Sequence, residues 1–186
     1  MLVKLSFQGI SQILGSDDIA LLLLTNEDNS RLITIVGDMS SANSILLRKE
    51  HKEISENLLP DVLWKVINKD ENREWQIRIV NVVDGQYKFV LYDMLLQQSF
   101  QLRASDGILL SVISGLPIFI DEMLMIHQSV PFDTNSPRMA LPVNAISDSM
   151  LQQALKKAVE NENYEQASHL RDELKRRKSD SDKKVD

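Results

Sequence analysis

The chain has 186 residues, a hydrophobic content of 43% and no cysteine. This length supports one well-buried core with an appendage rather than two ordinary domains. The absence of cysteine excludes disulfides, thiolate metal sites and a cysteine nucleophile, and it fits a reducing compartment. The longest uninterrupted apolar run, Ile19–Leu24, is too short to cross a bilayer, and we expect a cytoplasmic protein without a membrane partner.

The formal net charge of −6 is unevenly distributed along the chain. Acidic and basic residues are equal in number over residues 147–186, so the excess of negative charge lies before Ser147. On average, a surface of this kind repels a phosphate backbone. The basic cluster Lys175–Lys178 falls at the predicted end of a helix, where cations meet the negative end of the helix dipole, and this explanation is preferred to a nucleic-acid patch.

The first third of the chain predicts a three-stranded meander followed by two helices. From Asp38 on, apolar residues recur at helical spacing, with Asp38 or Ser40 as the predicted cap. A second helix is predicted over residues 58–66, with Pro60 in its first turn. Three segments with strand-like apolar patterns precede these helices: residues 2–14, 19–25 and 32–36.

The middle of the chain predicts a hairpin, a further strand, a helix and a short strand. Asp84-Gly85 stands between two strand-like runs, and this dipeptide favours a tight turn because both turn residues adopt positive φ. Residues 100–104 alternate as a strand, and Ser105 caps a predicted helix that ends at Gly115. Residues 118–120 form the last strand. The hairpins indicate an α+β fold with a mixed, largely antiparallel sheet and flanking helices.

The C-terminal part predicts an α-helical hairpin. Apolar residues within 150–162 and within 164–174 each draw one stripe along a helix. Helices this short are marginal alone in water, so their stripes must pack against the main domain, a second copy or a different protein. The predicted division of the chain is an α+β domain at 1–130, a linker at 131–146, the hairpin at 147–178 and a disordered tail at 179–186.

The hairpin contains a specific run, Tyr-Glu-x-Ala-x-x-x-Leu-Arg-Asp-x-Leu, at residues 164–174. This run resembles the UVR motif, which is found at the ends of excision-nuclease subunits and in adaptors of bacterial proteolysis. The resemblance implies a module for protein contact, whereas the alternative is an ordinary terminal hairpin packed on its own domain. The residues expected to contact a protein partner are Leu155, Tyr164, Ala167, Leu170, Arg171 and Leu174.

A second motif consists of Arg-Ala-Ser-Asp-Gly-Ile at residues 103–108, followed by Gly115 and by Pro-Ile-Phe-Ile at 117–120. Together with Ile-Val-Gly at 35–37 and Asp84-Gly85, it resembles the signature of the bifunctional nuclease family. The resemblance implies a bacterial nuclease that cuts DNA and RNA. Some members of that family also carry a UVR motif at the same end.

Phosphodiester hydrolysis requires charge neutralisation on the phosphate and an activated water, often with divalent ions held by carboxylates. Arg103 would clamp the phosphate, and Asp106 would hold Mg²⁺ or act as a base. The expected catalytic residues are Arg103, Ser105 and Asp106, and the cofactor implied is Mg²⁺ or Mn²⁺. The acidic residues that would join them, if the sheet brings them close, are Asp93, Asp121 and Glu122. No set of histidines has the spacing of metal ligands.

The motif at 103–108 also has a purely structural explanation. Ser105 as a helix cap, Asp106 in the first turn and an Arg103–Asp106 ion pair are what a helix start favours. The chain departs from the family pattern as well, since family members commonly carry a glutamate shortly after the position of Gly37, a His-Asp pair at 56–57 and a proline at 104. The alternative function is therefore a non-catalytic, homo-oligomeric adaptor that recruits a partner through the hairpin.

Overall fold

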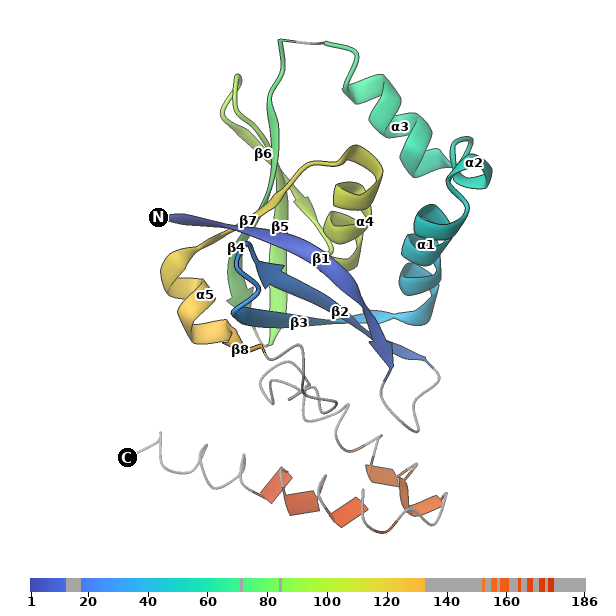
Figure 1. The fold of residues 1–186 in the computed structure, drawn as a ribbon, viewed down its shortest axis with the longest axis vertical. Coiled ribbons are helices and arrows are strands. Elements are labelled where there is room, and N and C mark those ends of the chain that lie inside the picture. Colours follow the sequence, from blue (N-terminus) through green and yellow to red (C-terminus); the bar gives the residue numbers. More distant parts are fainter. Residues whose placement is uncertain are drawn as a thin grey trace.

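The structure of the chain is a computed structural model that describes residues 1–12, 18–70, 72–83 and 85–132 and a set of C-terminal positions. In this part of the chain one sheet is flanked by helices, and α1 and α4 lie on the same side of it (Figure 1). The described C-terminal positions are 152, 155, 156, 158–160, 164, 167, 168, 171, 172, 174 and 175.

The sheet has the order β6-β5-β4-β7-β1-β2-β3-β8. Neighbouring strands are antiparallel except β4 and β7, which pair in parallel with Ile77 opposite Ile118. The predicted α+β fold with a mixed, largely antiparallel sheet is therefore confirmed. The strands are β1 (Leu2–Gln12), β2 (Ile19–Asn26), β3 (Arg31–Asp38), β4 (Trp75–Val83), β5 (Gln86–Asp93), β6 (Gln98–Leu102), β7 (Ile118–Asp121) and β8 (Val130–Pro131).

The helix boundaries follow local chemistry. The Asp38 carboxylate accepts a hydrogen bond of 2.7 Å from the Ser41 N–H and so caps α1, as predicted. Gly115 adopts a φ of 74° and ends α4 in the left-handed conformation that glycine tolerates. The helices are α1 (Met39–Glu50), α2 (Lys52–Ser55), α3 (Leu59–Ile67), α4 (Ala104–Ser114) and α5 (Glu122–Gln128).

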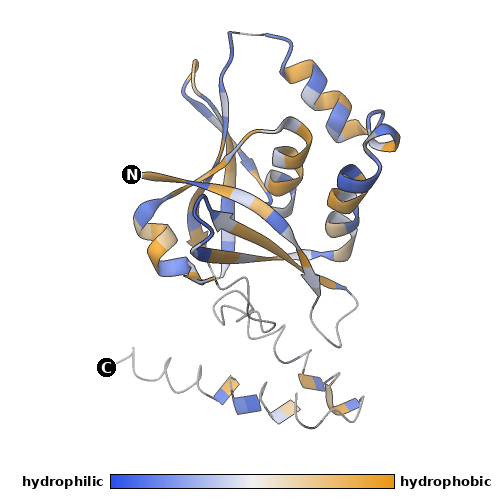
Figure 2. Ribbon diagram, in the orientation of Figure 1, coloured by the Kyte–Doolittle hydropathy of each residue, from blue (hydrophilic) through white to orange (hydrophobic). Residues whose placement is uncertain are grey.

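The core lies between the sheet and helices α1 and α4. Strand β2 is buried on both faces, and its side chains divide between two hydrophobic clusters. Leu22 and Leu24 belong to the large cluster, which also contains Ile108 of α4, whereas Leu21 and Leu23 belong to a small cluster on the other face. This two-sided burial explains why β2 is a continuous apolar run rather than an alternating one. The run is visible as an uninterrupted hydrophobic ribbon in Figure 2.

Helix α3 is attached to the body differently. Trp64 is buried against the large cluster, and Asp61 pairs with Arg48 of α1. Most of its apolar residues, which the sequence places at helical spacing, face solvent. The exposed ones are Leu58, Leu59, Val62, Leu63 and Val66.

Two expectations about element boundaries are wrong. The N-cap of α4 is Arg103, not Ser105, and it makes no side-chain capping hydrogen bond. Ala104 is the first residue of α4 rather than the end of a strand. After α4 and β7, helix α5 continues to Gln128, and β8 pairs with β3. Two hydrogen bonds from Arg31 to Ser129 stabilise this connection, at 2.6 and 2.8 Å.

All described positions between 152 and 175 are helical, in agreement with the predicted hairpin. Ala158, Ala167 and Leu174, which lie on the predicted stripes, are buried, whereas Tyr164 is 67% exposed. Leu170 lies outside the described residues, and so does Asp84 in the predicted β4–β5 turn. Val83 pairs with Gln86, and Gly85 has a φ of 73°, so the two strands form the predicted hairpin.

Candidate functional site

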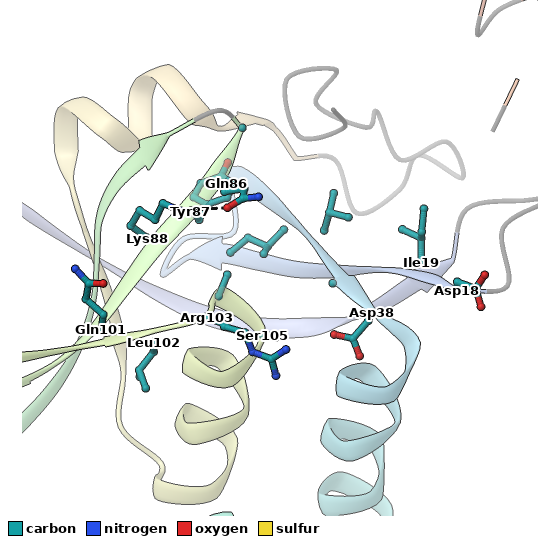
Figure 3. Close-up of a pocket in the computed structure, with 15 residues that line it drawn as sticks. Asp18, Ile19, Asp38, Gln86, Tyr87, Lys88, Gln101, Leu102, Arg103 and Ser105 are labelled. Atoms are coloured by element: carbon teal, nitrogen blue, oxygen red, sulfur yellow. Dashed lines mark hydrogen bonds between the residues drawn. The ribbon is translucent and has the colours of Figure 1, made fainter. Parts of the chain in front are cut away.

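A cavity of about 710 Å³ opens where four chain segments meet. Its wall combines two carboxylates, two cations, two hydroxyls and two side-chain amides. It is shown in Figure 3. The polar lining residues are Asp18, Asp38, Gln86, Tyr87, Lys88, Gln101, Arg103 and Ser105.

The sheet topology brings these segments together. Ile19 at the start of β2 pairs with Asp38 at the end of β3, and the Met39 N–H donates to the Asp18 carbonyl over 3.2 Å. On the other wall, Leu102 at the end of β6 pairs with Phe89 of β5. Helices α1 and α4 both begin at this cavity, because Asp38 and Arg103 are their N-caps. The positive ends of two helix dipoles therefore point toward it.

Arg103 is held by the next turn of its own helix. Its Nε donates to Asp106 Oδ2 over 2.7 Å, and its Nη2 donates to Asp106 Oδ1 over 2.9 Å. The predicted Arg103–Asp106 pair is thus confirmed, in a bidentate form. The Arg103 side chain is 70% exposed and the Asp106 side chain 40% exposed. Such an exposed pair adds little to stability, so its main consequence is to orient the guanidinium.

Asp38 faces Arg103 across the space between the two helix starts (Figure 3). The hydrogen bond from the Ser41 N–H holds the pKa of the Asp38 carboxyl below its usual value, and the charge of Arg103 lowers it further. Asp106 and, to a smaller extent, Asp38 raise the pKa of the Arg103 guanidinium. Both groups are therefore charged at neutral pH. The ionised Asp38 carboxylate has no proton to donate, and its lone pairs that Ser41 does not use can accept a further hydrogen bond.

Two hydroxyls in the cavity have no hydrogen-bond partner among the described residues. Ser105 is 6% exposed and lies in the first turn of α4, where the backbone N–H groups also have no helical acceptor. Tyr87 is 7% exposed, and burial raises its pKa to about 12, so its hydroxyl stays protonated. Among the described residues, the buried side-chain polar atom without a partner is Trp75 Nε1, so neither of these hydroxyl oxygens is sealed from solvent. Both can therefore donate to a ligand in the cavity.

The structure separates the other predicted acidic residues from this cavity. Asp93 is opposite Gln98 at the far end of β6, and its carboxylate accepts from the Leu95 and Leu96 N–H groups. Asp121 caps α5 and lies near the N-terminal amine. Glu122 follows it. Neither joins Arg103. Across the residues that the structure describes, no group of three or more acidic, histidine or cysteine side chains could hold a metal ion.

Sequence reasoning missed Asp18, Asp38 as a site residue, Tyr87 and Lys88. Asp38 directly follows the Ile-Val-Gly segment, so its position at a strand end was a usable signal. The sequence gave no such signal for Asp18 and Tyr87, because their position near Arg103 depends on which strands pair.

Residues 22–133 match the bifunctional nuclease domain, which covers more than half of the chain. The chain belongs to the bifunctional nuclease domain family. Asp38, Arg103 and Ser105 lie within the matched segment. Residues 150–179 match the UvrB/uvrC motif, a motif of protein and DNA contact. None of the curated proteins matches the chain. In the described part of the chain, no helix has the length and apolar character needed to span a membrane.

Proposed function

We propose that the cavity binds a phosphodiester of DNA or RNA and hydrolyses it with the help of Mg²⁺ or Mn²⁺. The observation that carries the proposal is the Ser105 hydroxyl, which has no partner among the described residues, beside Arg103 at the start of α4, with the Asp38 carboxylate on the opposite wall. Cations and N–H groups on one side and carboxylates on the other are what phosphate binding and water activation require.

The phosphate would lie at the N-terminal end of α4. There the Ser105 hydroxyl and the N–H groups of the first turn would donate to its oxygens. Arg103 keeps Nη1 free of Asp106 and would add a charged donor. In this arrangement Asp106 acts as a positioning residue, because each of its oxygens already accepts from Arg103. A direct role of Asp106 as metal ligand or base stays a prediction.

The donor set on the opposite wall fits a divalent ion that prefers oxygen. Mg²⁺ is commonly held by one or two carboxylates, with waters and substrate phosphates as the other ligands, so Asp38 would suffice. When bound, the ion would neutralise phosphate charge and lower the pKa of a water. Asp38 is ionised at neutral pH, as a ligand must be. Tyr87, which keeps its proton, would donate a hydrogen bond to a phosphate oxygen.

Cleavage of labelled single-stranded DNA and RNA by the purified chain, with Mg²⁺, Mn²⁺ or EDTA, tests the proposal. We expect activity that EDTA abolishes, and a loss of roughly 100- to 1,000-fold in Arg103→Ala, as for removal of one oxyanion donor. Asp38→Ser should lose a comparable factor although serine still caps α1.

The matched control is Asp121→Ser, which makes the same exchange at the cap of α5, outside the cavity. It should cleave like the unchanged chain. Activity that survives in both Arg103→Ala and Asp38→Ser, or that falls equally in Asp121→Ser, would reject the cavity as the site.

We propose in addition that the C-terminal hairpin recruits a protein partner. The match to the UvrB/uvrC motif favours this, and so does the contrast between the exposed Tyr164 and the buried Ala167 and Leu174. The buried pair would hold the hairpin together, while Tyr164 and the exposed Arg171 would contact the partner. Leu155 and Leu170 stay predicted contacts, and self-association of the chain stays a prediction.

Tyr164→Ala should abolish co-purification of the partner without changing the thermal unfolding of the main domain, because exposed aromatic residues dominate interface energetics. Lys156→Ala, also on an exposed helical position, is the control and should retain the partner. Co-purification that is indifferent to Tyr164→Ala would contradict this role. A chain that loses its partner in Tyr164→Ala yet never cleaves nucleic acid would be a non-catalytic adaptor.

A further inference from the structure

The outward face of β4, β5 and β6 presents a polar surface next to the cavity. Side chains alternate along each strand, so the neighbours of the buried Ile77 and Leu91 point away from the core. Two rows cross the three strands: Gln76, Tyr92 and Ser99 form one, and Arg78, Val90 and Gln101 form the other. We call the polar members of these rows, together with Lys88, the outer sheet face: Gln76, Arg78, Lys88, Tyr92, Ser99 and Gln101.

The outer sheet face is basic in an acidic chain. The only carboxylate in the three strands is Asp93, which is 1% exposed and belongs to the inward side. Arg78 Nε and Nη2 donate to the Gln76 Oε1 over 3.0 and 2.7 Å, and Lys88 Nζ donates to the Gln86 Oε1 over 3.1 Å. Neither cation has an acidic partner among the described residues. Their charge is therefore available to an anion.

Arg78 also forms a stacking platform. Its guanidinium carbon lies 4.0 Å from the centroid of the Tyr92 ring, and both side chains are partly exposed. A planar cation over an aromatic ring is a surface on which an unstacked base packs. Gln76, Ser99 and Gln101 surround it with donors and acceptors suited to base edges and phosphates. A protein interface needs an apolar centre instead, and the apolar residue of the two rows, Val90, is only 7% exposed.

The outer sheet face is continuous with the cavity, because Lys88 and Gln101 belong to both (Figure 3). We propose that it binds single-stranded nucleic acid and guides the strand to the cavity. The guiding step rests on the function proposed above, whereas the binding step does not. Duplexes should bind less well, since their bases are already stacked.

Fluorescence anisotropy of the full chain with labelled oligo-dT, oligo-U and a matching duplex, in EDTA, tests the binding step. We expect tighter binding to both single strands than to the duplex. Tyr92→Ala should weaken this binding about tenfold, whereas Tyr92→Phe, which keeps the ring, should not. Arg78→Gln should reduce the slope of log K against log salt by about 1.

Lys65→Gln removes one positive charge from α3 and is the control for net charge. It should bind like the unchanged chain, and circular dichroism checks the fold of every variant. Equal affinity in Tyr92→Ala and Lys65→Gln, preference for the duplex, or no binding by the unchanged chain would overturn the inference. If the unchanged chain binds single strands but does not cleave them, only the proposed hydrolysis is refuted. If Tyr92→Ala cleaves and binds like the unchanged chain, only the role of the outer sheet face is refuted.

Discussion

Asp61→Ala should lower the free energy of unfolding by about 3–5 kcal/mol, as removal of one partner from a buried ion pair does. Arg48 and Asp61 connect the last turn of α1 to the first turn of α3, with side-chain exposures of 4% and 11%. Arg48 Nε donates to Asp61 Oδ2 over 3.1 Å, and Nη1 donates to the Ser44 carbonyl over 2.6 Å. Each charge also lies at the favourable end of its helix dipole.

The loss is large because the variant leaves the Arg48 charge buried without a carboxylate. Helix α3 has few other attachments, since most of its apolar residues face solvent and its core contacts are Trp64 and the partly buried Ile67. Urea denaturation followed by circular dichroism measures the change. The double variant Arg48→Met/Asp61→Leu should recover most of the stability, because an apolar pair of similar volume avoids the desolvation penalty.

Leu59→Ala provides the surface control. Leu59 is 75% exposed on the same helix, and its truncation should change the free energy of unfolding by less than about 0.5 kcal/mol. If Asp61→Ala is equally mild, or if the double variant is as unstable as the single one, the ion pair does not hold α3 in place.

Local chemistry accounts for the parts of the fold that the sequence predicts well. Asp38 and Gly115 act on backbone groups within a few residues, so their capping roles can be read from neighbours alone. The prediction for Ser105 failed in a similar setting, because a serine inside the first turn resembles one that precedes it. Its hydroxyl faces the cavity instead of an N–H of its own helix.

The candidate site depends on contacts that no local pattern encodes. The strand order places β3 and β6 far apart in the sheet, and Asp38 and Arg103 come together because α1 and α4, the helices that they begin, pack against each other on one side of it. The same order separates Asp93 and Asp121 from Arg103, although all three are polar residues at strand ends. The family resemblance indicated Arg103 and Ser105 as site residues, whereas the carboxylates of the cavity, Asp18 and Asp38, were found only in the structure.

Gly107→Ala should destabilise the chain by about 1–3 kcal/mol, although the same exchange stabilises most helix interiors by nearly 1 kcal/mol. A Cβ at position 107 would lie 2.4 Å from Cδ1 of the Phe89 ring, 3.0 Å from its Cγ and 3.2 Å from its Cβ. Rotating the ring relieves only the first of these contacts. Phe89 is 1% exposed in the core, so it has no space to retreat, and α4 must move away from β5.

Movement of α4 would displace the helix start that carries Arg103 and Ser105, so nucleic-acid cleavage, where present, should fall together with stability. Thermal and urea unfolding of Gly107→Ala, Gly9→Ala and Gly107→Ala/Phe89→Leu measure the effect. No atom lies within 4 Å of the point that an alanine methyl would occupy at Gly9, so this position should tolerate alanine. The smaller leucine should make the double variant more stable than Gly107→Ala alone. Two glycine variants of equal stability would show that α4 and β5 adjust without cost, and that this close approach does not position the site.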